Sequence, residues 1–350
     1  MSKPIDLKTV NIFEPLKKKP ETFGHKEYSF FNSESVYDVL SKNSNETVTY
    51  WFKLQQAWCN NAYNTFKDYD SYLILVYLVN TVFQKYSDRF QYLSYEEFYA
   101  KNELVIDKIN LIEISKELNI PKETIRRKVN FLQDQGIVYR DGKSIFLNVS
   151  KIAIQKPVTS IGLIATCLAN FSNLLSSQNW FGDKISQKTI IKFIQDHFTV
   201  SWEYFFRFQI PYLVRHRTFF GDLESWNVFG SIALVQIREL IEKTQKQVVD
   251  APGNFRDFYL YSLKHKAKRG INASSISDIS AIPRATVIRK LKVMEKKKLI
   301  NRNKNLEYSM GSQPVHLKGL EENYLIHQKL WSDYTTTMYN LMKHSKLKIN

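Results

Sequence analysis

The chain has few of the residues that mark secreted, metal-binding or membrane-spanning proteins. Only two cysteines occur in 350 residues, Cys59 and Cys167, and they are too far apart for a Cys-x-x-Cys motif. Their scarcity predicts a reducing compartment and no zinc site. The longest apolar run, 72–83, is interrupted by Asn80 and Thr81 and is shorter than the roughly 20 residues that span a bilayer. The N-terminus lacks an apolar signal core, so we expect a cytoplasmic protein.

Acidic residues are scarce relative to basic ones. The chain has 50 lysines and arginines against 34 acidic residues, which gives a net charge of +16 and a pI near 9.5. This balance favours a polyanionic partner, either a nucleic acid or a membrane surface. The hydrophobic fraction of 43% is sufficient for well-formed cores, and the length fits two domains of roughly 150 residues. No nucleophile–base pair and no cluster with metal-ligand spacing is apparent, so we expect no enzymatic activity, cofactor or metal.

The most informative positive feature is an internal repeat. Residues 114–140 (ISKELNIPKETIRRKVNFLQDQGIVYR) align without a gap with 276–302 (ISDISAIPRATVIRKLKVMEKKKLINR), at an offset of 162 (276 − 114). Upstream, 50–55 align with 204–209 at an offset of 154 (204 − 50), so eight residues are inserted in the second copy, with the turn-rich stretch 248–255 as the candidate. The identical pairs in the gapless block are Ile114/Ile276, Ser115/Ser277, Ile120/Ile282, Pro121/Pro283, Thr124/Thr286, Arg127/Arg289, Lys128/Lys290 and Arg140/Arg302.

Each copy has the pattern of a helix-turn-helix followed by a hairpin. In the first copy, a short helix buries Ile112, Ile114 and Leu118, and Pro121 begins a second helix over 122–134. Apolar residues at helical spacing predict the buried stripe of that helix, with Ile125, Val129 and Leu132 in the first copy and Val287, Leu291 and Met294 in the second. Gly136 is expected to end the helix, and 137–140, 141–142 and 143–147 to form strand, turn and strand.

The opposite face of each second helix is basic. A helix-turn-helix with such a wing places this helix in a DNA major groove and the hairpin along the backbone. Arg126 and Asn130 favour base contacts by the first copy, whereas the lysines of the second favour a stronger electrostatic anchor. The predicted DNA contacts are Lys122, Thr124, Arg126, Arg127, Asn130, Arg140 and Lys143 in the first copy and Arg284, Thr286, Arg289, Lys292, Lys296, Arg302 and Lys304 in the second.

Other polar and aromatic groups have structural interpretations. The acid pairs Asp68/Asp70 and Asp222/Glu224 precede apolar runs, which predicts N-caps and first-turn acids in preference to a metal site. The aromatic rows at 50–58 and 204–208 are expected to form a helix–helix core, with a ligand pocket as the alternative. A helix-turn-helix can also be a protein-interaction module, but two basic copies favour nucleic acid.

The segments 120–140 and 282–302 resemble the recognition helix and wing of bacterial winged-helix transcription regulators, especially MarR-type ones. The resemblance covers about 40 residues in each half. It implies a double-stranded DNA partner and flanking helices that form a dimer interface, and it leaves a small-molecule effector open. Three features depart from the family: the Asp-x-Arg wing signature is absent from both copies, the upstream helices are longer and more aromatic, and one chain carries both copies.

Together these patterns predict a mainly α protein with two repeated helical units in a pseudo-dimer. We expect an N-terminal arm (1–32), a first unit (33–176) with a winged helix at about 107–150, and a second unit (186–346) with one at about 269–312. The predicted function is a sequence-specific, nucleoid-associated transcriptional regulator, in which one chain per site suffices or a homodimer forms. A plasmid-type tandem winged-helix replication initiator and a non-specific chromosome-architecture protein are the alternatives.

Overall fold

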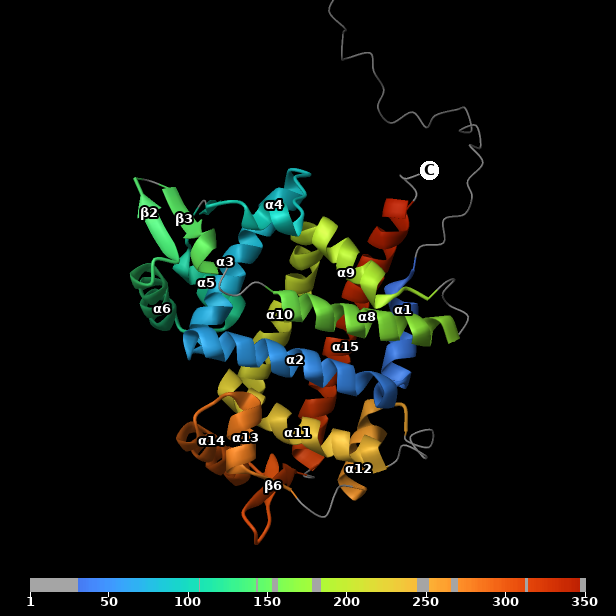
Figure 1. Cartoon of the computed structure of the whole chain (residues 1–350). Helices are drawn as coiled ribbons and strands as arrows, with labels where there is room; N and C mark the ends of the chain where they lie inside the picture. Colours follow the sequence, from blue (N-terminus) through green and yellow to red (C-terminus); the bar gives the residue numbers. More distant parts are fainter. Residues whose placement is uncertain are drawn as a thin grey trace, which may run out of the picture.

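The computed structural model describes residues 31–106, 108–142, 144–152, 157–177, 184–243, 252–265, 270–311 and 314–346. The described chain is mainly helical and has two small antiparallel sheets of three strands each, which confirms the predicted mainly α class (Figure 1). The predicted arm lies outside the described residues, apart from positions 31 and 32, and so does the first part, 248–251, of the candidate insertion.

The elements follow the same order in the two halves of the chain, with the short helix α7 as an extra element in the first. The first half contains α1 (Ser33–Lys42), α2 (Ser44–Phe66), α3 (Tyr69–Asp88), α4 (Tyr95–Tyr99), β1 (Glu103–Ile106), α5 (Leu111–Leu118), α6 (Lys122–Asp134), β2 (Val138–Asp141), β3 (Ser144–Asn148), α7 (Val149–Ile152) and α8 (Val158–Ser177). The second contains α9 (Gln187–Asp196), α10 (Phe198–Phe220), α11 (Leu223–Lys243), α12 (Phe255–Lys264), β4 (Ile271–Asn272), α13 (Ala273–Ser280), α14 (Arg284–Lys296), β5 (Ile300–Arg302), β6 (Glu307–Met310) and α15 (Pro314–Lys346).

The first residues of corresponding helices differ by the same two offsets that the sequence shows. The first residues of α1, α2 and α3 precede those of α9, α10 and α11 by an offset of 154 (187 − 33). The first residues of α5 and α6 precede those of α13 and α14 by an offset of 162 (273 − 111). The inserted stretch therefore enters after the start of α11 and before α13. We call β1, α5, α6, β2 and β3 module 1, and β4, α13, α14, β5 and β6 module 2.

Local chemistry explains the turn in each module. Helix α5 ends in a left-handed residue, Asn119 (φ 50°), and the serine four positions earlier, Ser115, donates a hydrogen bond from Oγ to the carbonyl oxygen of Ile120 at 2.6 Å. Module 2 repeats this arrangement, because Ser277 Oγ donates to Ile282 O, also at 2.6 Å. Both prolines that begin the next helices have φ −54° and ψ 136°. The repeated serine and proline thus define the turn.

Each sheet is antiparallel with the third strand in the middle, in the orders β1-β3-β2 and β4-β6-β5. One prediction about module 1 is wrong: Ile112 is 65% exposed, whereas Ile114 and Leu118 are buried. Residues 114 and 118 are four apart and share a helix face, but a position two residues before 114 points away from it.

The core runs through both halves of the chain (Figure 1). The first helix of each half packs against the last helix of the other, α1 on α15 and α9 on α8. Likewise α3 packs on α10, and α11 on α2. The aromatic rows lie in this core, as predicted: Trp58, Phe205, Phe206 and Phe208 are buried. At its centre Gln55 and Gln209, one from each half, each donate an amide hydrogen bond to the other at 3.0 Å.

Helix α8 is long and apolar enough, by length and composition alone, to cross a membrane. The run 72–83, which is the longest apolar run by sequence, lies outside this helix. More than half of its apolar window is buried inside the protein, as in a helix that packs in a protein core.

Candidate nucleic-acid interface

The predicted DNA contacts lie on the surfaces of α6, α14 and the two hairpins. Thr124 and Thr286 are half-buried, and Lys143 lies outside the described residues. The other predicted contacts are all exposed: Lys122, Arg126, Arg127, Asn130, Arg140, Arg284, Arg289, Lys292, Lys296, Arg302 and Lys304. These side chains are therefore accessible to a polyanion. In Figure 1, α6 and α14 lie at the same side of the helical core.

The opposite face of each helix anchors it to the core. The predicted apolar stripes, Ile125, Val129 and Leu132 in α6 and Val287, Leu291 and Met294 in α14, are buried as expected. Helix α6 packs on α3, and α14 packs on α11.

A lysine–aspartate ion pair also joins each of these two helices to the helix on which it packs. Lys128 Nζ lies 2.8 Å from Asp68 Oδ2, and Lys290 Nζ lies 2.5 Å from Asp222 Oδ2. Both aspartates also cap a helix, as predicted, by accepting from the backbone N–H of Ser71 and Ser225. Burial raises the pKa of Asp68, but the hydrogen bonds from Lys128 and Ser71 outweigh it and hold that pKa below its usual value.

This second role of the capping acids was missed in the sequence. A signal for it was present, because Lys128/Lys290 is one of the three pairs that are identical in the two helices. Asp68 and Lys128 are far apart in the chain, with α3, α4, β1 and α5 between them, so no local pattern joins them.

In each module, a side chain from the other half of the chain bonds the C-terminal end of the first helix. Arg217 on α10 donates from Nη1 to the carbonyl oxygen of Asn119, at the end of α5, and from Nε to Asp70 Oδ1, both at 2.9 Å. In module 2, Asn60 on α2 donates to the carbonyl oxygen of Ile279 at 2.6 Å. Neither module is therefore positioned by its own half alone.

The exposed faces of α6 and α14 are not equivalent. Arg126 in module 1 lies 2.6 Å from Glu123 Oε1, and both side chains are mostly exposed. An exposed pair of this kind stabilises by only a few tenths of a kcal/mol up to about 1, so Arg126 can exchange Glu123 for a phosphate or a base edge. Ile288, half-buried, occupies the corresponding position in module 2.

The two wings also differ at their tips. In module 1, Gly142 adopts a left-handed φ of 57° in a tight turn. In module 2, Asn303 Oδ1 accepts from the backbone N–H groups of Asn305 at 3.0 Å and Glu307 at 2.9 Å. Leu306 lies between them with φ 59° and is 61% exposed. The second wing thus has an exposed apolar side chain, Leu306, directly before its returning strand.

Metal binding and cysteine reactivity find no support in the described part of the chain. It contains no group of three or more His, Cys, Asp or Glu residues that could hold a metal ion. Both cysteines are buried, and burial raises the pKa of the Cys59 thiol to about 12, which disfavours the reactive thiolate.

The comparisons with known proteins add no further support. No family model, no curated protein and no solved structure matches this chain.

Proposed function

We propose that this protein is a sequence-specific DNA-binding transcriptional regulator, nucleoid-associated in the cell, that uses two non-identical winged helices in one chain. The observation that carries the proposal is the pair of basic helices, α6 and α14, each with its apolar stripe and a lysine docked on the core and its remaining cations exposed. A helix that is buried on one side and cationic on the other can enter a major groove without unfolding the protein.

The order of elements supports winged helices. Each module runs strand, helix, turn, helix, strand, strand, and its hairpin closes a three-stranded antiparallel sheet. In such an arrangement the second helix contacts bases and the hairpin contacts the backbone. This assigns Arg140 and Arg302 to phosphates, because each lies on the strand that leads into its hairpin turn.

A two-fold relation between the halves supports a covalent pseudo-dimer. In a two-fold dimer, residues on the axis meet their own copies, and every other contact occurs twice. Gln55 and Gln209 behave as such an axial pair. The pairings α1–α15 with α9–α8, and α3–α10 with α11–α2, are the duplicated contacts.

The same relation fits sequence-specific recognition, because two heads related by a two-fold axis match inverted half-sites within one site. A non-specific architectural protein has no use for exposed Arg126 and Asn130 at positions that suit base contacts.

Binding to duplex DNA should depend steeply on salt. With roughly 6–10 phosphate contacts, the affinity should fall by about 10³–10⁵ between 50 and 200 mM salt, because bound lysines and arginines release counterions. The measurement is a fluorescence-anisotropy titration of labelled duplex at several salt concentrations. No binding at low salt, or an affinity that does not change with salt, would contradict the proposal.

A further inference from the structure

The hairpin of module 2 ends in a loop of three residues, 304–306. The backbone N–H of Asn303 donates to the carbonyl oxygen of Glu307 at 2.9 Å and closes this loop, and within it the N–H of Leu306 donates to Asn303 O at 3.1 Å. Leu306, the third loop residue, has a left-handed φ of 59°. Three-residue hairpin loops place this residue in the left-handed region, where glycine is the residue without a steric penalty.

Leucine at this position carries a conformational cost that packing does not repay. In the left-handed region the Cβ atom of an L-residue crowds the following carbonyl oxygen. Leu306 is 61% exposed, and in the described part of the chain it belongs to neither hydrophobic core cluster. The fold should therefore be at least as stable with glycine here. A strained residue that the fold does not need points to a role in binding.

Polar contacts hold the tip of this hairpin in one shape. Asn303 Oδ1 accepts from the backbone N–H groups of Asn305 and Glu307, and Asn303 Nδ2 donates to Glu307 Oε2 at 2.7 Å. At the base of the hairpin, Arg302 Nε lies 3.1 Å from Glu295 Oε1, which links the hairpin to α14. The leucine is thus presented in a defined place beside α14, so little order has to be created when it contacts a partner.

The surroundings of Leu306 are cationic. Arg302 and Lys304 are exposed on the same hairpin, and Lys292 and Lys296 are exposed on α14. Proteins that bind the DNA minor groove combine cations with an apolar side chain that inserts between base pairs. A membrane surface is the less suitable polyanion, because one leucine buries too little apolar surface to hold a protein to lipid.

The position of the hairpin places this contact outside the two half-sites. In Figure 1, β6 lies at the bottom of the view and β2 and β3 at the upper left, with α6 and α14 between them. With these two helices in major grooves, the hairpin of module 2 reaches the DNA that flanks its half-site. The hairpin of module 1 has no counterpart of the leucine, because Asp141 pairs with Ser144 and only Gly142 and Lys143 lie between them.

We propose that Leu306 inserts between two base pairs in the minor groove beside the half-site of module 2, unstacks that step and bends the duplex toward its major groove. The inference rests on the proposed function, because it requires duplex DNA as the partner. It adds a bend at one end of the site only. Pyrimidine–purine steps are the easiest to unstack, so a TA or CA/TG step should lie at this place.

The test uses the duplex that the wild-type protein selects from a random pool, labelled at its two ends with a donor–acceptor pair. Energy transfer should show a bend with the wild-type protein, and Leu306→Gly should reduce it by at least about 20° while the duplex stays bound. The fluorescence of 2-aminopurine placed at the flanking steps should rise at one step with the wild-type protein only. An equal bend with Leu306→Gly, or a straight bound duplex with the wild-type protein, would overturn this inference alone. No binding of any duplex would overturn the proposed function as well.

Matched variants separate the apolar contact from other effects. Leu306→Met keeps an apolar side chain and should keep the bend. Phe90 is also exposed (82%) and left-handed (φ 53°), but it lies outside both modules, between α3 and α4, so Phe90→Gly should leave the bend unchanged. The opposite result for either variant would overturn the inference. In urea, Leu306→Gly should unfold at a midpoint no lower than that of the wild-type protein, because glycine relieves the strain. A lower midpoint would show that the leucine serves the fold and would also overturn the inference.

Discussion

Lys128 and Lys290 illustrate what identity between the two copies means at the scale of single residues. Both lysines point into the protein and bind capping aspartates, and the identical Ser115/Ser277 and Pro121/Pro283 pairs define turns. The identical residues therefore mostly preserve architecture. The residues that diverge, among them Arg126 and its counterpart Ile288, lie where base contacts are expected.

Arg126 and the lysines of module 2 should have different effects on binding. Arg126→Ala should cost roughly 1–3 kcal/mol on the best site and little on random duplex, because a base contact is lost. The paired substitution Lys292→Ala and Lys296→Ala should weaken binding to all sequences about equally and reduce the salt slope, because phosphate contacts are lost. Competition titrations with specific and random duplex separate the two effects. An equal loss on both duplexes for Arg126→Ala would show that module 1 does not provide the base contacts.

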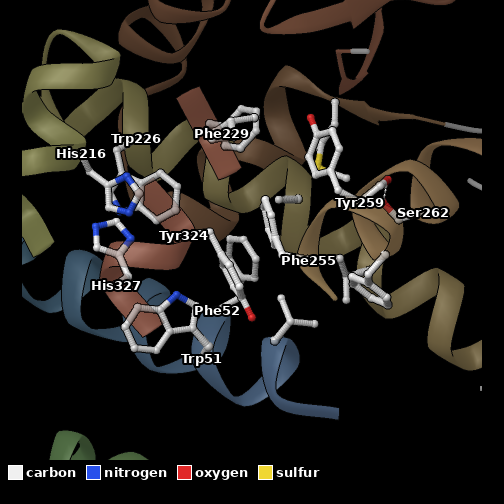
Figure 2. A pocket seen from close by; sticks show the side chains of 16 residues that line it. Trp51, Phe52, His216, Trp226, Phe229, Phe255, Tyr259, Ser262, Tyr324 and His327 are labelled. Carbon is white, nitrogen blue, oxygen red and sulfur yellow. Dashed lines mark hydrogen bonds between the residues drawn. The ribbon is translucent and has the colours of Figure 1, made fainter. Parts of the chain in front are cut away.

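The buried histidines His216 and His327 (Figure 2) make the stability of the fold depend on pH. Their pKa values lie below 6.5 in the folded protein. As the pH falls below about 6.5, the unfolded chain therefore binds protons that the folded chain does not, and stability falls. Each histidine should contribute a loss of about 1.4 kcal/mol per pH unit, continuing toward the folded-state pKa.

Urea unfolding at pH 7.5, 6 and 5 measures this dependence. His216→Phe combined with His327→Phe should flatten it between pH 6.5 and 5, where carboxylates contribute little. An unchanged slope in the double variant would show that the histidines are not the source of the effect.

At the scale of elements, local sequence patterns predicted the bounds of helices well. Contacts between distant parts of the chain could not be predicted from them. The bounds 122–134 predicted for the second helix match α6, because apolar spacing and Pro121 define them locally. Ile112 was misplaced because a helix as short as α5 offers too few turns to fix the orientation of its apolar face. The roles of Arg217 and Asn60 could not be predicted, since each bonds the end of a helix in the other half of the chain.

The serine in each turn provides a matched pair of tests. Ser115→Ala and Ser277→Ala each remove a 2.6 Å hydrogen bond to a backbone carbonyl. Each should therefore lower the free energy of unfolding by about 1 kcal/mol, and by nearly the same amount. Urea denaturation gives both values. A loss in one variant with none in the other would show that the two turns are not equivalent.

At the scale of the whole molecule, the two modules depend on one shared helical core. Each half supplies the first helix that packs on the last helix of the other, and each supplies a side chain that bonds the end of the first helix in the other module. The sequence revealed the duplication but not this exchange, because partners across a two-fold relation leave no local periodicity. In the proposed DNA complex, this arrangement would present the second module at high effective concentration once the first had bound.

This account makes a specific claim about the DNA site. Thr124/Thr286 and Arg127/Arg289 are shared, whereas Arg126 and Asn130 face Ile288 and Lys292. The site should therefore be an imperfect palindrome, with half-site centres about one helical turn, roughly 10 base pairs, apart.

The most direct test is to select binding sequences from a random pool, footprint them, and determine the number of chains per duplex by analytical ultracentrifugation. The account predicts an imperfect inverted repeat that is protected over both half-sites by one chain. A perfectly symmetric site occupied by two chains, each using one module, would contradict it.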